Sequence, residues 1–313
     1  MKTKFKFDAR GRQRLFYAFL KYFSYVCAAI AVAALAYLLY FIFSRGLRYV
    51  TWRFIFGEYD TKNPSLRPAI VGTLYLVFIS MAIALPIGIF TAIFLTEYKV
   101  QHTLLRWIRI AAETLAAIPS IVYGLFGYIV FVVILGWGYS MLGGGITLSV
   151  MVLPVIIRTT EEAILAVPKE LREASYALGS SKVRTIFRIV LPNAVAGIVS
   201  SMILAIGRVI SESAVLIMTI GMIMEKVPGM MTGGSSLALS VYYFASFGFP
   251  RHAAAAAVVL TMLVLIINLS ATLVGRLLSR GKVAAPPKTL FSKLFEMIAK
   301  LKKGGRKAKG KDK

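Results

Sequence analysis

Residues 168–192 read PKELREASYALGSSKVRTIFRIVLP, a polar segment that lies between two apolar runs. Pro168 suits the first position of a helix, because its missing N–H would be unpaired there in any case. Gly179 supplies the backbone freedom that a sharp turn needs. A second short amphipathic helix is predicted over residues 182–190, and we expect the chain to return to an apolar run at Pro192. The segment therefore predicts two short helices that meet at a bend.

The composition around this segment is typical of a membrane protein. Hydrophobic residues make up 58% of the chain and charged residues 16%, whereas about a quarter of residues are charged in ordinary soluble domains. A helix of about 20 apolar residues crosses the hydrocarbon core of a bilayer. Apolar runs lie at 22–43, 69–95, 111–135, 146–167, 193–221 and 253–275, and the fourth carries charges beyond residue 157. The sequence predicts an all-α polytopic membrane protein with about six transmembrane helices.

The basic residues predict how the chain is oriented. The net charge is +24, and the lysines and arginines gather in residues 1–21 and from Arg276 onward. If both termini are cytoplasmic, 29 of the 37 basic residues fall on the cytoplasmic side and seven on the other, as the positive-inside rule requires. This predicts a multi-pass protein of the cell (inner or plasma) membrane, with segment 168–191 inside. No zinc, RRM or basic-zipper pattern accompanies the charge, so no nucleic-acid partner is expected.

The polar segment resembles the EAA loop of ABC importer permeases, whose pattern is EAA-x3-G-x9-I-x-L-P. The matching residues are Glu173, Ala174, Gly179, Ile189, Leu191 and Pro192, and Ser175 replaces the second Ala. The resemblance implies the type I ABC importer permease architecture. It also implies that Glu173, Ala174 and Gly179 couple the chain to a separate ATPase subunit, which grips this loop. The alternative from the residues alone is an ordinary pair of interfacial helices.

Four other segments are similar to the PstA-type permease subunit of phosphate ABC importers. These are residues 69–98, 118–128, 207–214 and 252–269, and the resemblance as a whole covers about 66–276. It implies this organisation: a basic cytoplasmic N-terminus (1–21), a first transmembrane helix (22–43), a permease core with five transmembrane helices (66–276) that includes the coupling loop 168–191, and a basic cytoplasmic tail (277–313).

The resemblance also implies a function and partners. The chain would form the translocation path of an importer for inorganic phosphate, which works by alternating access. Its partners would be a second permease subunit of the PstC type, an ABC ATPase that binds ATP and Mg²⁺, and an external phosphate-binding protein. A heterodimer of permeases is expected, and a homodimer stays open. The alternatives are a permease for molybdate or sulfate, or an ion-coupled secondary transporter.

Two charges interrupt the fifth apolar run. Arg208 and Glu212 are four residues apart, which predicts that they lie on one face of the fifth helix. Charges at this depth are costly and must face protein or water. Arg208 could contact an oxyanion in the translocation path while Glu212 holds it in place, as the resemblance implies. The alternative is an ion pair that only neutralises itself, and the hydroxyls of Ser211 and Ser213 are weaker candidates for the path.

Ser120 is a further weak candidate. Pro119 could end one helix and let Ser120 begin another, whose free N–H groups would suit an anion; a simple proline kink is the alternative.

No Walker A sequence is present, so the chain is predicted to be no enzyme and to bind no cofactor itself. The single cysteine, Cys27, and the two histidines lack metal-ligand spacing, so no metal site and no catalytic residue is predicted.

Overall fold

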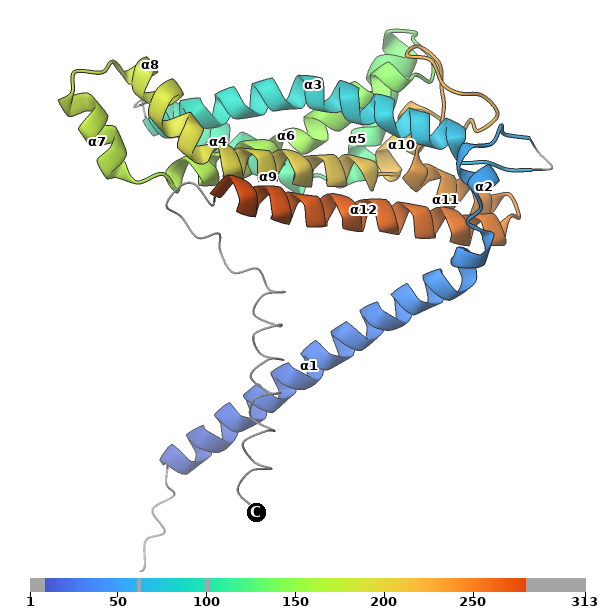
Figure 1. Cartoon of the computed structure of the whole chain (residues 1–313), viewed down its shortest axis with the longest axis horizontal. Helices are drawn as coiled ribbons and strands as arrows, with labels where there is room; N and C mark the ends of the chain where they lie inside the picture. The colour runs from blue at the N-terminus through green and yellow to red at the C-terminus, as the bar shows by residue number, and fades with distance from the viewer. Residues whose placement is uncertain (1–8, 61–62, 99–101, 280–313) are drawn as a thin grey trace, which may run out of the picture. The chain divides into compact units, whose positions relative to one another are not determined.

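The structure is a computed structural model that describes residues 9–60, 63–98 and 102–279. These residues are helical, and no strand is found among them (Figure 1). In chain order the helices are α1 (Ala9–Gly46), η1 (Leu47–Tyr49), α2 (Trp52–Phe56), α3 (Arg67–Glu97), α4 (His102–Ala117), α5 (Ser120–Gly127), η2 (Tyr128–Ile134), α6 (Met141–Leu165), α7 (Lys169–Ala177), α8 (Lys182–Thr185), η3 (Ile186–Val190), α9 (Leu191–Ile210), α10 (Ala214–Thr219), α11 (Leu237–Ser246) and α12 (Pro250–Ser279).

Five helical spans in the described part of the chain are long and apolar enough to cross a membrane. They are Phe19–Tyr49, Arg67–Glu97, Met141–Leu165, Lys182–Ile210 and Pro250–Gly275. A sixth is possible if Thr103–Ala117 and Ser120–Ile134, which are bent by 97° at a break, count as one. The prediction of an all-α protein with about six crossings is confirmed. The basic tail, 277–313, lies almost wholly outside the described residues.

Three predicted boundaries differ in the structure. The first helix starts at Ala9, well before residue 22, although its apolar part agrees with the prediction. The third predicted run, 111–135, is divided between α4 and α5–η2. The fifth run, 193–221, is also divided, because α9 ends at Ile210 and α10 starts at Ala214.

Contacts divide the chain into two compact units. The first takes the described residues up to Leu76, together with Gly124–Gly144 and Ile210–Leu263; the second takes those in Val77–Tyr123, Gly145–Val209 and beyond Val264. The first unit has an aromatic core in which Phe54 and Phe244 lie 6.0 Å apart between ring centroids. Near it, burial and a hydrogen bond with the Tyr243 hydroxyl raise the pKa of Tyr59 above its ordinary value.

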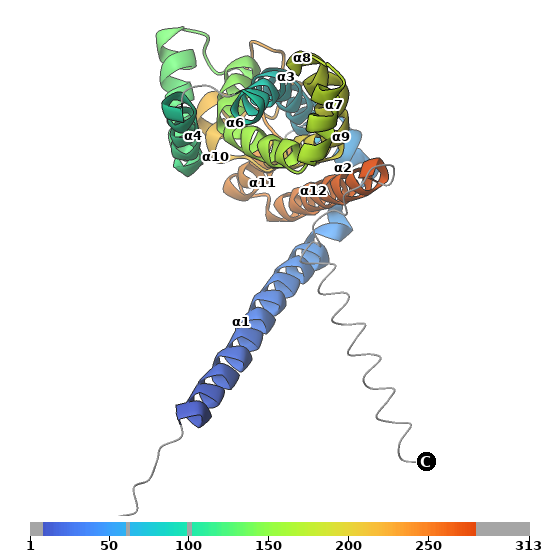
Figure 2. The same ribbon diagram turned by 90° about the vertical axis from the view of Figure 1, so that its left-hand side faces the viewer.

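The core of the second unit is the one that positions the candidate site. Its buried members come from the end of α3, the end of α6, η3 and the start of α9: Ala92, Ile93, Ile164, Val167, Ile186, Val190, Ala194 and Ile198. Gly88 of α3 faces Ile156 of α6, and a Cβ on Gly88 would collide with that side chain. The close packing of α3, α6 and α9 gives α7 and α8 a firm base, from which they project as a bent pair (Figures 1 and 2).

Candidate functional site

The bend after α7 is built from backbone hydrogen bonds. Gly179 has φ +74°, a conformation that residues with a Cβ rarely adopt. The N–H of Gly179 donates to the carbonyl of Tyr176 (2.9 Å), and the N–H of Ser180 donates to that of Ser175 (3.1 Å). This pair of bonds is the Schellman motif, which closes a helix by satisfying its last carbonyls. The predicted turn at Gly179 is confirmed.

A buried hydroxyl pair locks the two arms of the bend together. The Ser175 hydroxyl lies 2.9 Å from that of Thr185, and both residues are buried. Ser181 then starts α8, because its hydroxyl accepts a hydrogen bond from the N–H of Arg184 (3.4 Å). Ser175, which replaces a family alanine, therefore gains a partner that an alanine could not have. The departure from the family pattern strengthens the bend.

The second arm is continuous with the fifth membrane span. Helical structure runs without interruption from Lys182 to Ile210. The helix therefore continues through Pro192, where the chain was expected to return to the membrane. The segment just before Pro192, η3, is π-helical. A proline ring clashes with the carbonyl of the preceding turn, and a widened turn is one way to relieve that clash.

The outer surface of the bend is exposed and partly apolar. Glu173, Ala174 and Gly179, the three predicted coupling residues, are all exposed. Leu178 at the tip is 87% exposed, and a Cβ on Gly179 would meet nothing within 4 Å. Leu171 and Tyr176 of α7 are exposed as well, and a group of exposed apolar side chains is typical of a protein interface. The structure thus leaves this surface open for a partner.

Arg172 joins the bend to the rest of its unit, and sequence analysis missed it. Its Nε donates to Glu97 Oε1 at the end of α3 (3.1 Å). Its Nη1 and Nη2 donate to the carbonyls of Val167 and Ile164 at the end of α6, both at 2.8 Å. The guanidinium therefore gives a donor to the Val167 carbonyl, just beyond α6, and a second donor to the Ile164 carbonyl, which also accepts from the Val167 N–H. It also pairs with a buried carboxylate.

A second contact joins the same two segments. The ammonium of Lys182, at the start of α8, lies 4.4 Å from the centre of the Tyr98 ring, within the range of a cation–π interaction. Glu97 and Tyr98 belong to segment 69–98, which resembles phosphate permeases, but the sequence alone assigned no function to either residue. The negative charge of Glu97, on the same predicted side of the membrane as Arg172, was the signal that could have suggested their pairing.

Arg208 is exposed near the end of α9. Its neighbours Gly207 and Val209 are buried, so the arginine lies on the outward side of an otherwise apolar helix. A guanidinium that faced lipid at this depth would be costly. This face is therefore one that an assembled transporter covers with protein or water.

The predicted pairing of Arg208 and Glu212 on one helix face is wrong. Because α9 ends at Ile210, Glu212 lies in a break with Ser211 and Ser213. The Glu212 carboxylate accepts a hydrogen bond from the N–H of Ala214, the first residue of α10 (3.1 Å). A side-chain acceptor of this kind competes with helix continuation, which explains the interruption. The role of these residues in the translocation path stays a prediction.

Ser120 is the first residue of α5, as the half-helix hypothesis required. The chain bends by 97° between α4 and α5, so the alternative of a simple proline kink is wrong. The N–H of Val122 donates to the carbonyl of Pro119 (3.0 Å). The anion-binding role of Ser120 stays a prediction.

In the part of the chain that the structure describes, no group of three or more metal-ligating side chains is found.

Comparison with known proteins identifies the family. The family model of the binding-protein-dependent transport system inner membrane component matches residues 84–283. The probable ABC transporter permease protein YqgI of Bacillus subtilis is 39% identical over 63% of this chain and 68% of its own length. The phosphate transport system permease protein PstA 1 of Mycobacterium tuberculosis is 32% identical over 83% of this chain and 88% of its own length.

Solved structures share the fold at lower identity. A permease chain of a bacterial alginate ABC transporter, in complex with its periplasmic protein, has a TM-score of 0.61 at 17% identity and covers 85% of this chain and 95% of its own. The MetNI methionine ABC transporter gives a TM-score of 0.55 at 22% identity and covers 67% and 93%. The chain is a multi-pass membrane protein and no enzyme itself, and its partners include a separate ATPase subunit and a substrate-binding protein. Together these findings show that it belongs to the binding-protein-dependent transport system inner membrane components, as a PstA-type permease subunit of an ABC importer.

Proposed function

We propose that the chain imports inorganic phosphate together with a second permease of the PstC type, and that both of its termini are cytoplasmic. The names of the PstA relatives support phosphate. An external phosphate-binding protein would deliver the anion. ATP and Mg²⁺ would bind the ATPase subunit, and no cofactor is assigned to this chain.

One observation carries the proposal: the second arm of the coupling bend and Arg208 lie on the same continuous helix. The helical span Lys182–Ile210 begins in the second arm of the bend. Arg208 follows Lys182 by 26 residues, which is about 39 Å along a helix that rises 1.5 Å per residue. A tilt imposed on one end of such a rod moves the other end. The sequence order thus supplies a direct mechanical link from the ATPase to a cation that suits phosphate.

The bend would supply the mechanism of alternating access. Glu173, Ala174, Leu178 and Gly179 would lie in a cleft of the ATPase, and closure of the ATPase on ATP would move them. Arg172 would pass the motion to α3 and α6, while α8 passes it to α9. The path would then open outward, and hydrolysis would reset it.

The chemistry of Arg208 fits an oxyanion. A guanidinium presents planar, permanently charged donors that match phosphate oxygens. Its exposure on the lone chain leaves it free to face a path formed with the second permease. Glu212 and the two adjacent serines stay candidates for that path by their chemistry alone, because they lie beyond the helix end.

Transport by the reconstituted complex tests the substrate. Proteoliposomes that contain both permeases, the ATPase and the binding protein would be given radiolabelled phosphate, with unlabelled sulfate or molybdate as competitor. We expect ATP-dependent uptake that neither competitor suppresses. Uptake that molybdate or sulfate abolishes would transfer the proposal to that anion, and uptake without ATP would point to an ion-coupled transporter.

Arg208→Gln is expected to lower the phosphate uptake rate by about 10- to 100-fold, because a hydrogen bond to a charged group contributes about 1.5–3 kcal/mol. Arg208→Lys should keep part of the activity, since it retains the charge but loses the planar donors. Arg158→Gln is the control: it removes an exposed arginine of α6, whose ion pair with Glu162 is open to solvent. Co-purification of the subunits should be unchanged in all three variants. Normal uptake by Arg208→Gln would remove Arg208 from the path.

A further inference from the structure

Helix α4 has the surface of a helix that lies in a membrane interface. One face packs inward through half-buried apolar side chains, namely Leu105, Ile108, Ala112 and Leu115. A neighbouring face exposes Leu104, Trp107 and Ile110, and Trp107 is 65% exposed. Charged residues lie between these two faces. A helix that is apolar on two sides and charged along a stripe suits the boundary between headgroups and acyl chains.

The charged stripe contains one arginine that forms no ion pair within the described part of the chain. Arg109 pairs with Glu161 of α6 at 2.5 Å between Nη2 and Oε1. Arg106 forms no ion pair with any residue that the structure describes. Glu113 on the same helix is seven residues away, about 10 Å along the axis. The guanidinium of Arg106 is therefore available to an anion from outside the protein.

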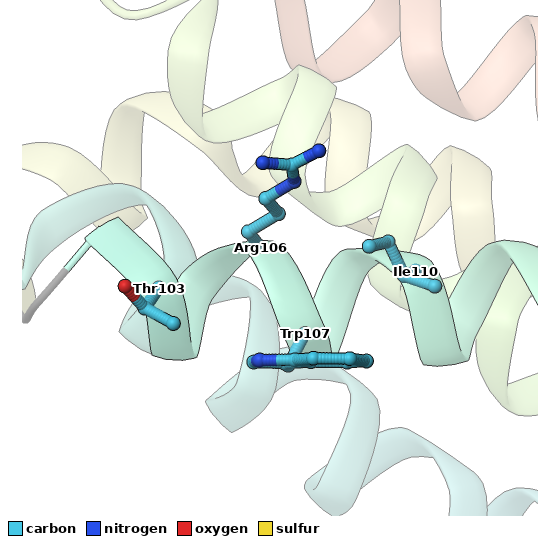
Figure 3. A pocket seen from close by; sticks show the side chains of 4 residues that line it. All are labelled: Thr103, Arg106, Trp107 and Ile110. Carbon is cyan, nitrogen blue, oxygen red and sulfur yellow. The ribbon is translucent and has the colours of Figure 1, made fainter.

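A hollow of about 370 Å³ lies beside this arginine. It is lined by Thr103, Arg106, Trp107 and Ile110, all from α4 (Figure 3). In Figure 3, the Arg106 side chain reaches away from one side of the α4 ribbon, and the Trp107 ring lies at the other side of the ribbon. The hollow therefore combines two polar groups, a hydroxyl and a guanidinium, with two apolar groups, an indole ring and an aliphatic side chain. The polar groups suit a phosphate, and the apolar groups suit the acyl chain that is joined to it.

A hydrogen bond, an ion pair and the bend at its end hold α4 roughly perpendicular to the helix that follows it. The chain turns by 97° between α4 and α5–η2, so if the latter crosses the bilayer, α4 lies roughly in its plane. The Tyr123 hydroxyl donates to the Leu115 carbonyl (2.7 Å). Glu161, the partner of Arg109, lies one turn before the end of α6, which leads into the coupling segment. This places α4 at the cytoplasmic surface of its unit.

We propose that α4 lies in the cytoplasmic headgroup layer and that Arg106 and Thr103 bind the phosphate of an anionic phospholipid, whose acyl chains lie against Trp107 and Ile110. Tryptophan is enriched at this depth of a membrane, and arginine is suited to phosphate. The preference for an anionic lipid follows from the unpaired charge of Arg106. The proposal does not depend on which anion the transporter carries.

Native mass spectrometry of the full chain tests the lipid preference. Adducts with dioleoylphosphatidylglycerol and dioleoylphosphatidylcholine would be compared at equal concentration. Arg106→Gln is expected to lower the preference for phosphatidylglycerol about fivefold, the factor that corresponds to about 1 kcal/mol per basic residue at an anionic surface. Arg48→Gln, an exposed arginine beyond α1, is the matched control and should leave it unchanged. An unchanged preference in Arg106→Gln would overturn the proposal, as would displacement of the lipid by millimolar inorganic phosphate.

Fluorescence quenching tests the depth of Trp107. In a chain with Trp52→Phe and Trp137→Phe, Trp107 is the one tryptophan left. Lipids brominated near the headgroup should quench it more strongly than lipids brominated near the end of the acyl chain. This should hold for the lone chain and for the assembled transporter. Absence of quenching in both would mean that α4 is not in the bilayer, and its loss on assembly would mean that a protein subunit covers this face; either result overturns the proposal.

Discussion

Arg172→Met is expected to destabilise the permease and to disconnect the coupling bend from transport. The Arg172 and Glu97 side chains are only 15% and 6% exposed. Removal of the arginine leaves a buried carboxylate without its counter-ion. The Val167 carbonyl loses the Arg172 donor, and the Ile164 carbonyl keeps only the N–H of Val167. Breaking a buried pair on one side costs about 3–5 kcal/mol. We expect a large loss of thermal stability in the purified complex and loss of ATP-driven uptake in proteoliposomes.

The double variant Arg172→Met, Glu97→Leu separates the two effects. Replacing both partners of a buried pair by apolar groups is often nearly neutral for stability. The double variant should therefore regain much of the unfolding temperature but not the rate of ATP-driven uptake, because α7 is still not tied to α6. Arg158→Met is the control, since exposed pairs contribute about 0–1 kcal/mol. Full recovery of transport in the double variant would reduce Arg172 to a structural residue.

The bend was predictable because its signals are local. Pro168 favours a helix start, and Gly179 permits the left-handed backbone that ends α7. The structure confirms both. Long apolar runs likewise predicted the number of spans, since length and hydropathy decide whether a helix can cross a bilayer.

The remaining features depend on contacts that periodicity does not reveal. Arg172 and Glu97 are 75 residues apart, so neither local pattern indicates the pair. The break after Ile210 contains no glycine or proline, and the apolar run around it continues to residue 221. What ends α9 is a polar trio, Ser211 to Ser213, in which Glu212 caps the next helix. Hydrogen-bond acceptors clustered in this way are typical of helix starts. The sequence contained this signal, but the three residues were interpreted as candidates for the translocation path.

The second large effect is expected from Gly179→Asp, which should abolish ATP-driven uptake in a permease that is folded and inserted. Aspartate and asparagine tolerate the left-handed conformation better than other residues with a Cβ. The structure leaves open space around a Cβ at this position, so the lone chain should accept either residue. An ATPase closely packed on the bend would not, because the new side chain would project beside Leu178 into the interface.

Gly248→Asp is the matched control for that variant. Gly248 has φ +83° and also has nothing within 4 Å of a Cβ, so the backbone strain is comparable, but it lies between α11 and α12, far along the chain from the bend. We expect the ATPase subunit to co-purify with Gly248→Asp and to be lost from Gly179→Asp. Gly179→Asn distinguishes charge from size: loss of the ATPase there too would show that close approach is what matters, whereas retention would point to repulsion of the carboxylate. If the Gly179→Asp permease still binds the ATPase subunit and takes up phosphate at a normal rate, the ATPase does not act on the bend.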